Sequence, residues 1–76
     1  MTITVYSTPA CHNCALAKEF LKNQGFQYSE KNVAADPVAL EWMLTQSGQM
    51  GVPVIEIDNE MIVGFDRNEM KKKLGL

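Results

Sequence analysis

The two cysteines of this chain, Cys11 and Cys14, lie where a strand-like pattern gives way to a helix-like one. Residues Thr2–Tyr6 alternate in polarity and are rich in β-branched side chains, which predicts a strand. A helix is expected to begin near His12, because Ala15–Gln24 is rich in residues that favour helices. A C-x-x-C pair between a strand and a helix constrains the chain strongly, since it is typical of a β-α-β unit that carries a reactive thiol.

Strand and helix patterns continue to alternate along the rest of the sequence. Strands are predicted at Phe26–Glu30, Val52–Ile57 and Met61–Val63, and helices from Pro37 to about Gln46 and from the cap residue Asp66 to Leu74. Asp36 is placed to cap the helix at Pro37, and Asp58-Asn59 is a hairpin turn signal. The order β-α-β-α-β-β-α predicts an α/β fold. A right-handed β-α-β crossover and an antiparallel hairpin would share a four-stranded mixed sheet flanked by helices on both faces.

The composition fits a single small domain over residues 1–76. The chain is 46% hydrophobic and 21% charged, which is ordinary for a globular protein. A net charge of −2 argues against nucleic-acid binding, and the basic run Lys71–Lys73 suits the last turn of a helix. No segment approaches the roughly eighteen apolar residues of a membrane span, and the N-terminus lacks an export signal. We therefore expect a cytoplasmic monomer that binds neither membranes nor nucleic acid.

The spacing of the cysteines favours chemistry over structural support. A disulfide across so short a loop would stabilise the fold by only about 2 kcal/mol, against about 3 kcal/mol for a 15-residue loop. At the start of a helix, free N–H groups and the helix dipole favour a thiolate. We therefore assign Cys11 as the candidate nucleophile and Cys14 as the thiol that resolves its mixed disulfide. The alternative is that both cysteines are small buried hydrophobic residues.

Further short motifs lie along essentially the whole length of the chain. They are Val5-Tyr6-Ser7, the Cys11–Cys14 motif, Ala17-Lys18, Ser47-Gly48, Val52-Pro53 and Ile62-Val63-Gly64-Phe65-Asp66. In these motifs the chain resembles the glutaredoxin family, including the glutaredoxin-like redoxins that reduce ribonucleotide reductase. The resemblance implies a thioredoxin/glutaredoxin-like fold and a dithiol oxidoreductase that acts on protein disulfides or glutathione mixed disulfides. It implies no tightly bound cofactor, glutathione as a co-substrate, and either glutathione or thioredoxin reductase as the electron source.

The resemblance also implies where substrates bind. The proline that corresponds to Pro53 is cis in the family and lies against the cysteines, and the adjacent backbone at Val52 would pair with a substrate main chain. Without the motif, Pro53 would be interpreted as a proline at a strand start or edge. Gly64, Phe65 and Asp66 correspond to the element that holds the γ-glutamyl end of glutathione. An ordinary strand end followed by a helix cap explains these three residues equally well.

Four positions depart from the family pattern. Thr8 and Gln49 stand where many members carry basic residues that pair with glutathione, so two charge-assisted hydrogen bonds would be missing. His12 and Asn13 replace the usual Pro-Tyr between the cysteines. A protonated His12 would stabilise the Cys11 thiolate and make the oxidised pair a stronger oxidant. The alternative is an exposed histidine with no energetic role.

Two other functional classes remain open. Some glutaredoxins hold a [2Fe–2S] cluster between two protomers with glutathione, so this chain could be a cluster carrier. A closed zinc site is disfavoured because Cys11, His12 and Cys14 lack a fourth ligand and adjacent side chains diverge. The chain could also be a binding module whose cysteines only sense the redox state.

Outside the motif, Glu56 is a charge within a predicted interior strand, where we expect it to be paired, for example with a lysine, or to lie on a shallow part of the sheet.

Overall fold

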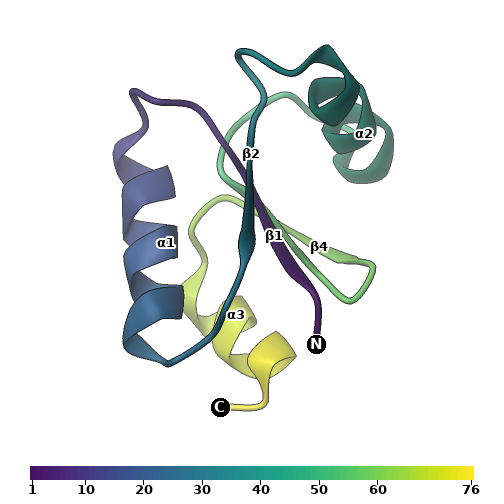
Figure 1. The fold of residues 1–76 in the computed structure, drawn as a ribbon. Coiled ribbons are helices and arrows are strands. Elements are labelled where there is room, and N and C mark those ends of the chain that lie inside the picture. Colours follow the sequence, from purple (N-terminus) through teal and green to yellow (C-terminus); the bar gives the residue numbers. More distant parts are fainter.

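The computed structural model describes residues 1–76 and contains the expected elements in the expected order (Figure 1). They are β1 (Ile3–Ser7), α1 (His12–Asn23), β2 (Ser29–Asn32), α2 (Pro37–Ser47), β3 (Val54–Ile57), β4 (Glu60–Val63) and α3 (Arg67–Leu74). None of the three helices is long and apolar enough to cross a membrane.

The four strands form one mixed sheet in the order β2-β1-β3-β4. β1 and β2 are parallel, as the β-α-β crossover requires, whereas β1 pairs antiparallel with β3 and β3 antiparallel with β4. The predicted four-stranded mixed sheet of the thioredoxin/glutaredoxin-like fold is therefore confirmed. Because β1 lies in the middle of this sheet, its C-terminal end delivers the cysteine loop to a central position.

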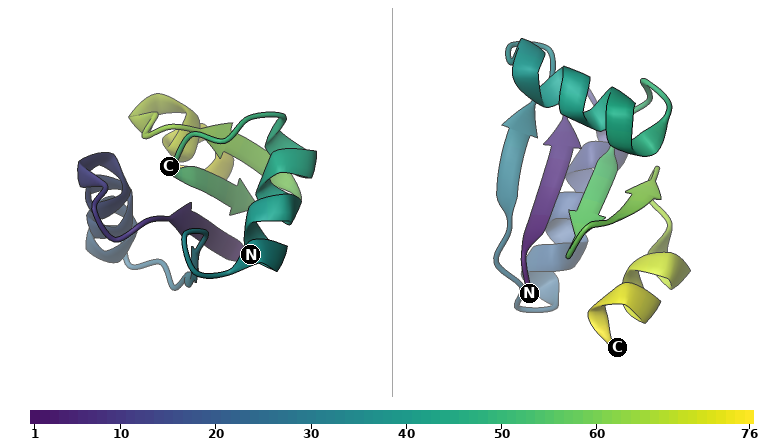
Figure 2. Two further views of the ribbon diagram at one scale, coloured as in Figure 1. Left: turned by 90° about the horizontal axis from the view of Figure 1, so that it is seen from above. Right: turned by 90° about the vertical axis from the view of Figure 1, so that its right-hand side faces the viewer.

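Helices cover both faces of the sheet, as predicted. Figure 2 shows α1 and α3 on one side and α2 on the other. Alternate residues of the strands divide between two apolar clusters. The α1/α3 face contains Ile3, Val5, Ala17, Phe20, Leu21, Ile55, Ile57, Ile62, Met70 and Leu74. The α2 face contains Tyr6, Val33, Ala39, Met43 and Val54.

The second strand begins later than predicted. We expected Phe26–Glu30, but β2 is Ser29–Asn32 and all four of its residues are exposed at the sheet edge. The α1 helix ends in a Schellman motif, in which the Gly25 N–H donates to the Lys22 carbonyl and the Phe26 N–H to the Leu21 carbonyl. Gly25 has the positive φ of 81° that this motif requires. Phe26 is therefore part of the C-terminal cap of α1, and the pairing of β2 with β1 begins only at Ser29.

Local sequence signals correctly predicted the start of α2 and the hairpin turn, but not the start of β3. Asp36 caps α2 through hydrogen bonds of 3.1 Å from the N–H groups of Val38 and Ala39. The Asp58-Asn59 turn has positive φ at both residues, and Ile57 pairs with Glu60 across it. That is the backbone of a two-residue type I′ hairpin. The third strand starts at Val54 rather than Val52, because Val52 and Pro53 lie in the preceding loop.

Candidate active site

Cys11 and Cys14 are joined as a disulfide at the N-terminus of α1, with their Cα atoms 5.2 Å apart. Cys11 is the N-cap residue of the helix, and its Sγ accepts a hydrogen bond of 3.1 Å from the Cys14 N–H. A backbone N–H of the first helical turn, which has no partner within the helix, is thus directed at the outer sulfur. In the reduced state, the same N–H and the helix dipole favour a thiolate on Cys11.

The two sulfurs differ in accessibility. Cys14 is 1% exposed and belongs to the buried face of α1, whereas Cys11 is partly exposed. An external disulfide can approach Cys11 but not Cys14. This difference is what the sequence-based assignment of Cys11 as nucleophile and Cys14 as resolving thiol requires.

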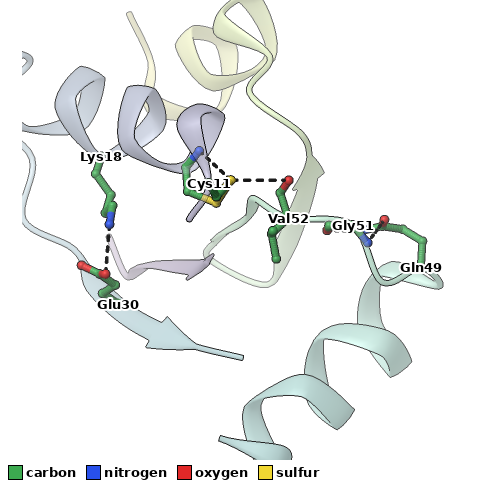
Figure 3. Close-up of a disulfide and its surroundings, with 7 residues drawn as sticks. Cys11, Lys18, Glu30, Gln49, Gly51 and Val52 are labelled. Atoms are coloured by element: carbon green, nitrogen blue, oxygen red, sulfur yellow. Dashed lines mark hydrogen bonds and ion pairs between the residues drawn. A yellow bond between two sulfur atoms is a disulfide. The ribbon is translucent and has the colours of Figure 1, made fainter. Parts of the chain in front are cut away.

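The loop before β3 lies beside the outer sulfur. The Cys11 Sγ is 3.9 Å from the Val52 carbonyl oxygen, and the two residues face each other in Figure 3. A disulfide sulfur carries no hydrogen, so this is a contact in the oxidised form and a hydrogen bond only when Cys11 is a thiol. The Val52–Pro53 peptide bond is cis, as the resemblance implied, and Pro53 is buried.

The end of β4 is tied to this loop. The Gly64 N–H donates a hydrogen bond of 2.8 Å to the Pro53 carbonyl. Gly64 has a φ of 81°, so a residue with a side chain would be strained at this position. Through Pro53, the fold brings Gly64 to the segment that touches Cys11, although 50 residues separate Gly64 from Cys14 in the sequence.

The next two residues have structural partners of their own. The Phe65 ring packs edge-to-face on Phe20 of α1, with ring centroids 6.3 Å apart. Asp66 is exposed and caps α3, accepting a hydrogen bond of 3.1 Å from the Glu69 N–H through Oδ1. The cap uses one carboxylate oxygen, so the second oxygen is available to a ligand. The Arg67 guanidinium lies over the Phe20 ring, 5.8 Å from its centroid.

No ion pair involves His12, Thr8 or Gln49. His12 is the first residue of α1 and is exposed, and no hydrogen bond holds its ring. Thr8 is partly exposed, and the Gln49 side chain is folded back on its own loop. Lys18, one helical turn beyond Cys14, forms an ion pair of 3.0 Å with Glu30 of β2 (Figure 3).

Glu56 is paired, which was one of the two expectations for it, but its partners are Tyr6 and Trp42 rather than a lysine. Its carboxylate accepts a hydrogen bond of 3.0 Å from the Tyr6 hydroxyl and lies 3.4 Å from the Trp42 Nε1, with no lysine in contact. Burial raises the pKa of the Tyr6 phenol, and the hydrogen bond to Glu56 and its negative charge raise it further. Trp42 is 46% exposed on α2. This cluster lies on the α2 face and supports the sheet away from the cysteines.

No group of three or more His, Cys, Asp or Glu side chains converges to hold a metal ion within this single chain. Sequence patterns identified the cysteines and the loops around them, but not the contacts made by Gln49 and Arg67. Gln49 was singled out only as a missing basic residue, and Arg67 carried no signal in the sequence. A glutamine in a loop and an arginine at a helix start are ordinary surface residues until the tertiary neighbours are known.

Comparisons with known proteins give relatives of nearly full length. Residues 3–62 match a family described as Glutaredoxin. An uncharacterized glutaredoxin-like 8.6 kDa protein in the rubredoxin operon of Clostridium pasteurianum is 46% identical over 70 residues, which cover 92% of this chain and 93% of that protein. The solved structure of the thioredoxin-like protein BC3987 superposes with a TM-score of 0.89 at 32% identity, covering 95% and 99% of the two chains. NrdH-redoxin from Escherichia coli superposes with a TM-score of 0.85 at 29% identity, covering 95% and 93%.

Proposed function

The chain belongs to the glutaredoxin family, and from this membership we propose that it is a dithiol–disulfide oxidoreductase for protein disulfides or glutathione mixed disulfides. The observation that carries the proposal is the unequal accessibility of the two sulfurs at the start of α1. Cys11 is partly exposed and its Sγ accepts a hydrogen bond from the Cys14 N–H, while Cys14 itself is buried. A nucleophile and a resolving thiol need this difference.

The proposed cycle moves two electrons from the cysteines to the substrate. The Cys11 thiolate attacks one sulfur of the substrate disulfide, forming a Cys11–substrate mixed disulfide and releasing the first substrate thiolate, which takes a proton from water. The Cys14 thiol then loses its proton and attacks the Cys11 sulfur. This step forms the Cys11–Cys14 disulfide and releases the second substrate thiolate, which is protonated in turn. The substrate is reduced, and the protein is left in the oxidised form described above.

The loop before β3 is the proposed binding edge for the substrate main chain. Val52 lies outside the sheet, and neither its N–H nor its C=O makes a backbone hydrogen bond. The Val52 carbonyl oxygen lies 3.9 Å from the Cys11 Sγ, and an extended substrate segment could pair with the N–H and C=O of Val52 as an added strand. Pro53 and Gly64 hold this edge in place through their mutual hydrogen bond.

Glutathione is the proposed co-substrate, bound between this edge and the start of α3. Gly64, Phe65 and Asp66 would contact its γ-glutamyl end, with the free oxygen of Asp66 accepting from the α-amine. The site offers no basic side chain at Thr8 or Gln49 for the glycine carboxylate. We therefore expect glutathione to bind more weakly here than at a site that carries both cations.

A reduction assay with two parallel electron sources tests the proposal. The oxidised protein is mixed with NADPH and either glutathione plus glutathione reductase or thioredoxin reductase, and a disulfide substrate is supplied. We expect NADPH consumption that depends on the protein in at least one system and that is lost in Cys11→Ser. Retention of activity in Cys11→Ser, or no activity in either system, would contradict the proposal. The system that supports turnover identifies the reductant.

The alternative role as a [2Fe–2S] carrier stays a prediction with a separate signature. It requires visible absorbance that co-elutes with a dimer after anaerobic purification in the presence of glutathione. The proposed oxidoreductase cycle requires neither the absorbance nor the dimer.

A further inference from the structure

The loop between α2 and β3 contains a pair of hydrogen bonds that the chemistry above does not use. The side-chain amide of Gln49 spans the backbone of Gly51: its Oε1 accepts from the Gly51 N–H at 2.5 Å, and its Nε2 donates to the Gly51 carbonyl at 3.0 Å (Figure 3). We call this pair of bonds the Gln49 clamp. An N–H needs an acceptor and a carbonyl needs a donor, so the two ends of the amide are fixed by their partners.

The clamp is anchored to the end of α2. The Ser47 hydroxyl lies 2.5 Å from the Met43 carbonyl and 3.1 Å from the Gln49 carbonyl, and its single proton can serve one of them at a time. The Gln49 Nε2 lies 3.5 Å from the Ser47 oxygen as well. The loop is therefore tied to the last turn of a helix that packs against the sheet through Met43.

The clamp ends where the proposed binding edge begins. Gly51 is followed by Val52, whose carbonyl lies 3.9 Å from the Cys11 Sγ. Gln49 occupies both polar backbone groups of Gly51, whereas those of the next residue, Val52, make no backbone hydrogen bond and are left to an incoming chain. In Figure 3, Val52 lies between Cys11 on one side and the Gln49 clamp on the other.

We propose that Gln49 is a positioning residue that holds the Val52 main chain in the orientation that pairs with the backbone of a polypeptide disulfide. The inference rests on the proposed function, because it assigns a preference to the same site. A fixed edge costs less conformational entropy on binding than a mobile one. Gln49 also favours polypeptides over ligands with a free carboxylate, since its amide is neutral and both of its ends are already engaged.

Gly51 provides an independent way to remove the clamp. A Cβ atom at this position would lie 2.7 Å from the Gln49 Oε1, too close for the amide to stay where it is. Gly51 is not among the glycines with a positive φ, so its backbone conformation does not itself exclude alanine. Gly51→Ala should therefore act by displacing the Gln49 side chain. In a chain that already carries Gln49→Ala, the same substitution should have little further effect.

The test compares two disulfides that differ in having a peptide backbone. Wild type, Gln49→Ala, Gly51→Ala and the double variant are supplied with the recycling reductant that supports turnover and with insulin or hydroxyethyl disulfide, and kcat and KM are measured for each disulfide. For insulin, we expect each single variant to lose about tenfold in kcat/KM, chiefly through a higher KM, which corresponds to about 1.4 kcal/mol of binding. The double variant should fall no further than either single variant. Hydroxyethyl disulfide offers no main chain to pair, so its rate should change less than about threefold.

Two further variants separate positioning from general damage. Gln49→Glu keeps an acceptor for the Gly51 N–H but loses the donor to the Gly51 carbonyl, so it should recover part of the insulin rate. Gln46→Ala, an exposed glutamine on α2 that makes no side-chain hydrogen bond, is the matched control and should leave both rates unchanged.

The outcomes are distinct. Unchanged insulin kinetics in Gln49→Ala, equal losses on both disulfides, or multiplying losses in the double variant would each overturn the role of Gln49. If the wild-type protein reduces neither disulfide, it is the proposed oxidoreductase function that has failed, whatever the variants do.

Discussion

Replacing Tyr6 by phenylalanine removes one buried hydroxyl that links two central strands. The Tyr6 side chain is 4% exposed on β1, and its hydroxyl donates to the Glu56 carboxylate on β3 at 3.0 Å. A hydrogen bond to a charged acceptor contributes about 1.5–3 kcal/mol. Glu56 is only partly buried and keeps the Trp42 Nε1 at 3.4 Å, so the lower end of this range applies. We expect Tyr6→Phe to lower the free energy of unfolding by about 1.5 kcal/mol, or the Tm by roughly 6–12 °C for a domain of this size.

The effect should also depend on pH in a defined direction. The pKa of the Tyr6 phenol is raised in the folded protein, first by burial and then by Glu56. The folded chain therefore keeps this proton at a pH where the unfolded chain has lost it. The contribution of Tyr6 is complete below the pKa of an unfolded tyrosine, about 10, and is lost as the pH rises from there toward the folded pKa. The stability difference between wild type and Tyr6→Phe should consequently narrow above about pH 10.

Urea unfolding followed by the fluorescence of Trp42, the single tryptophan, measures this difference. The midpoint should shift while the slope stays constant. Tyr28→Phe is the matched control, because Tyr28 is partly buried against the core but its hydroxyl makes no hydrogen bond within the chain. That control should change stability by less than about 0.5 kcal/mol. A Tyr6→Phe effect as small as the control, or a difference that grows above about pH 10, would refute the reasoning.

Three further outcomes follow from the site and the helix caps. Cys14→Ser should leave the attack by Cys11 intact but trap the mixed disulfide, so mass spectrometry should detect a covalent adduct of the protein with its disulfide substrate; no adduct would reject the assigned roles. His12→Pro should make the reduction potential more negative by about 10–30 mV if a protonated imidazole stabilises the thiolate, and an unchanged redox titration would show that His12 has no such role. Asp36→Ala removes the acceptor for two N–H groups of α2 and should destabilise the protein by about 1 kcal/mol in thermal unfolding, whereas no shift in Tm would contradict the cap.

Sequence signals were most accurate for the elements that are stabilised by interactions between residues close together in the chain. The Asp36 cap, the Asp58-Asn59 turn and the end of α2 each depend on hydrogen bonds or φ angles within a few residues. The start of β2 was misplaced because the apolar pattern of Phe26 has two local explanations, a strand and a helix end. The Schellman motif takes precedence here, since the Phe26 N–H already pairs with the Leu21 carbonyl.

Buried polar partners were beyond the reach of local patterns. The charge at Glu56 was recognised as unusual, but its partners were not, because Tyr6 lies 50 positions away and is brought close only by the pairing of β1 with β3. The Gln49 clamp is the opposite case. It spans only two residues, yet its significance depends on the Cys11 sulfur, which is 41 positions from Val52.

By itself, the sequence determined the order of the elements, the position of both cysteines at a helix start, and hence which sulfur is suited to become a thiolate. These properties follow from backbone geometry within one helical turn. Only the tertiary structure decided what faces that sulfur. The antiparallel pairing of β3 with β1 and β4 places Val52 against Cys11 and Gly64 against Pro53, and no interaction between sequence neighbours could have fixed those contacts.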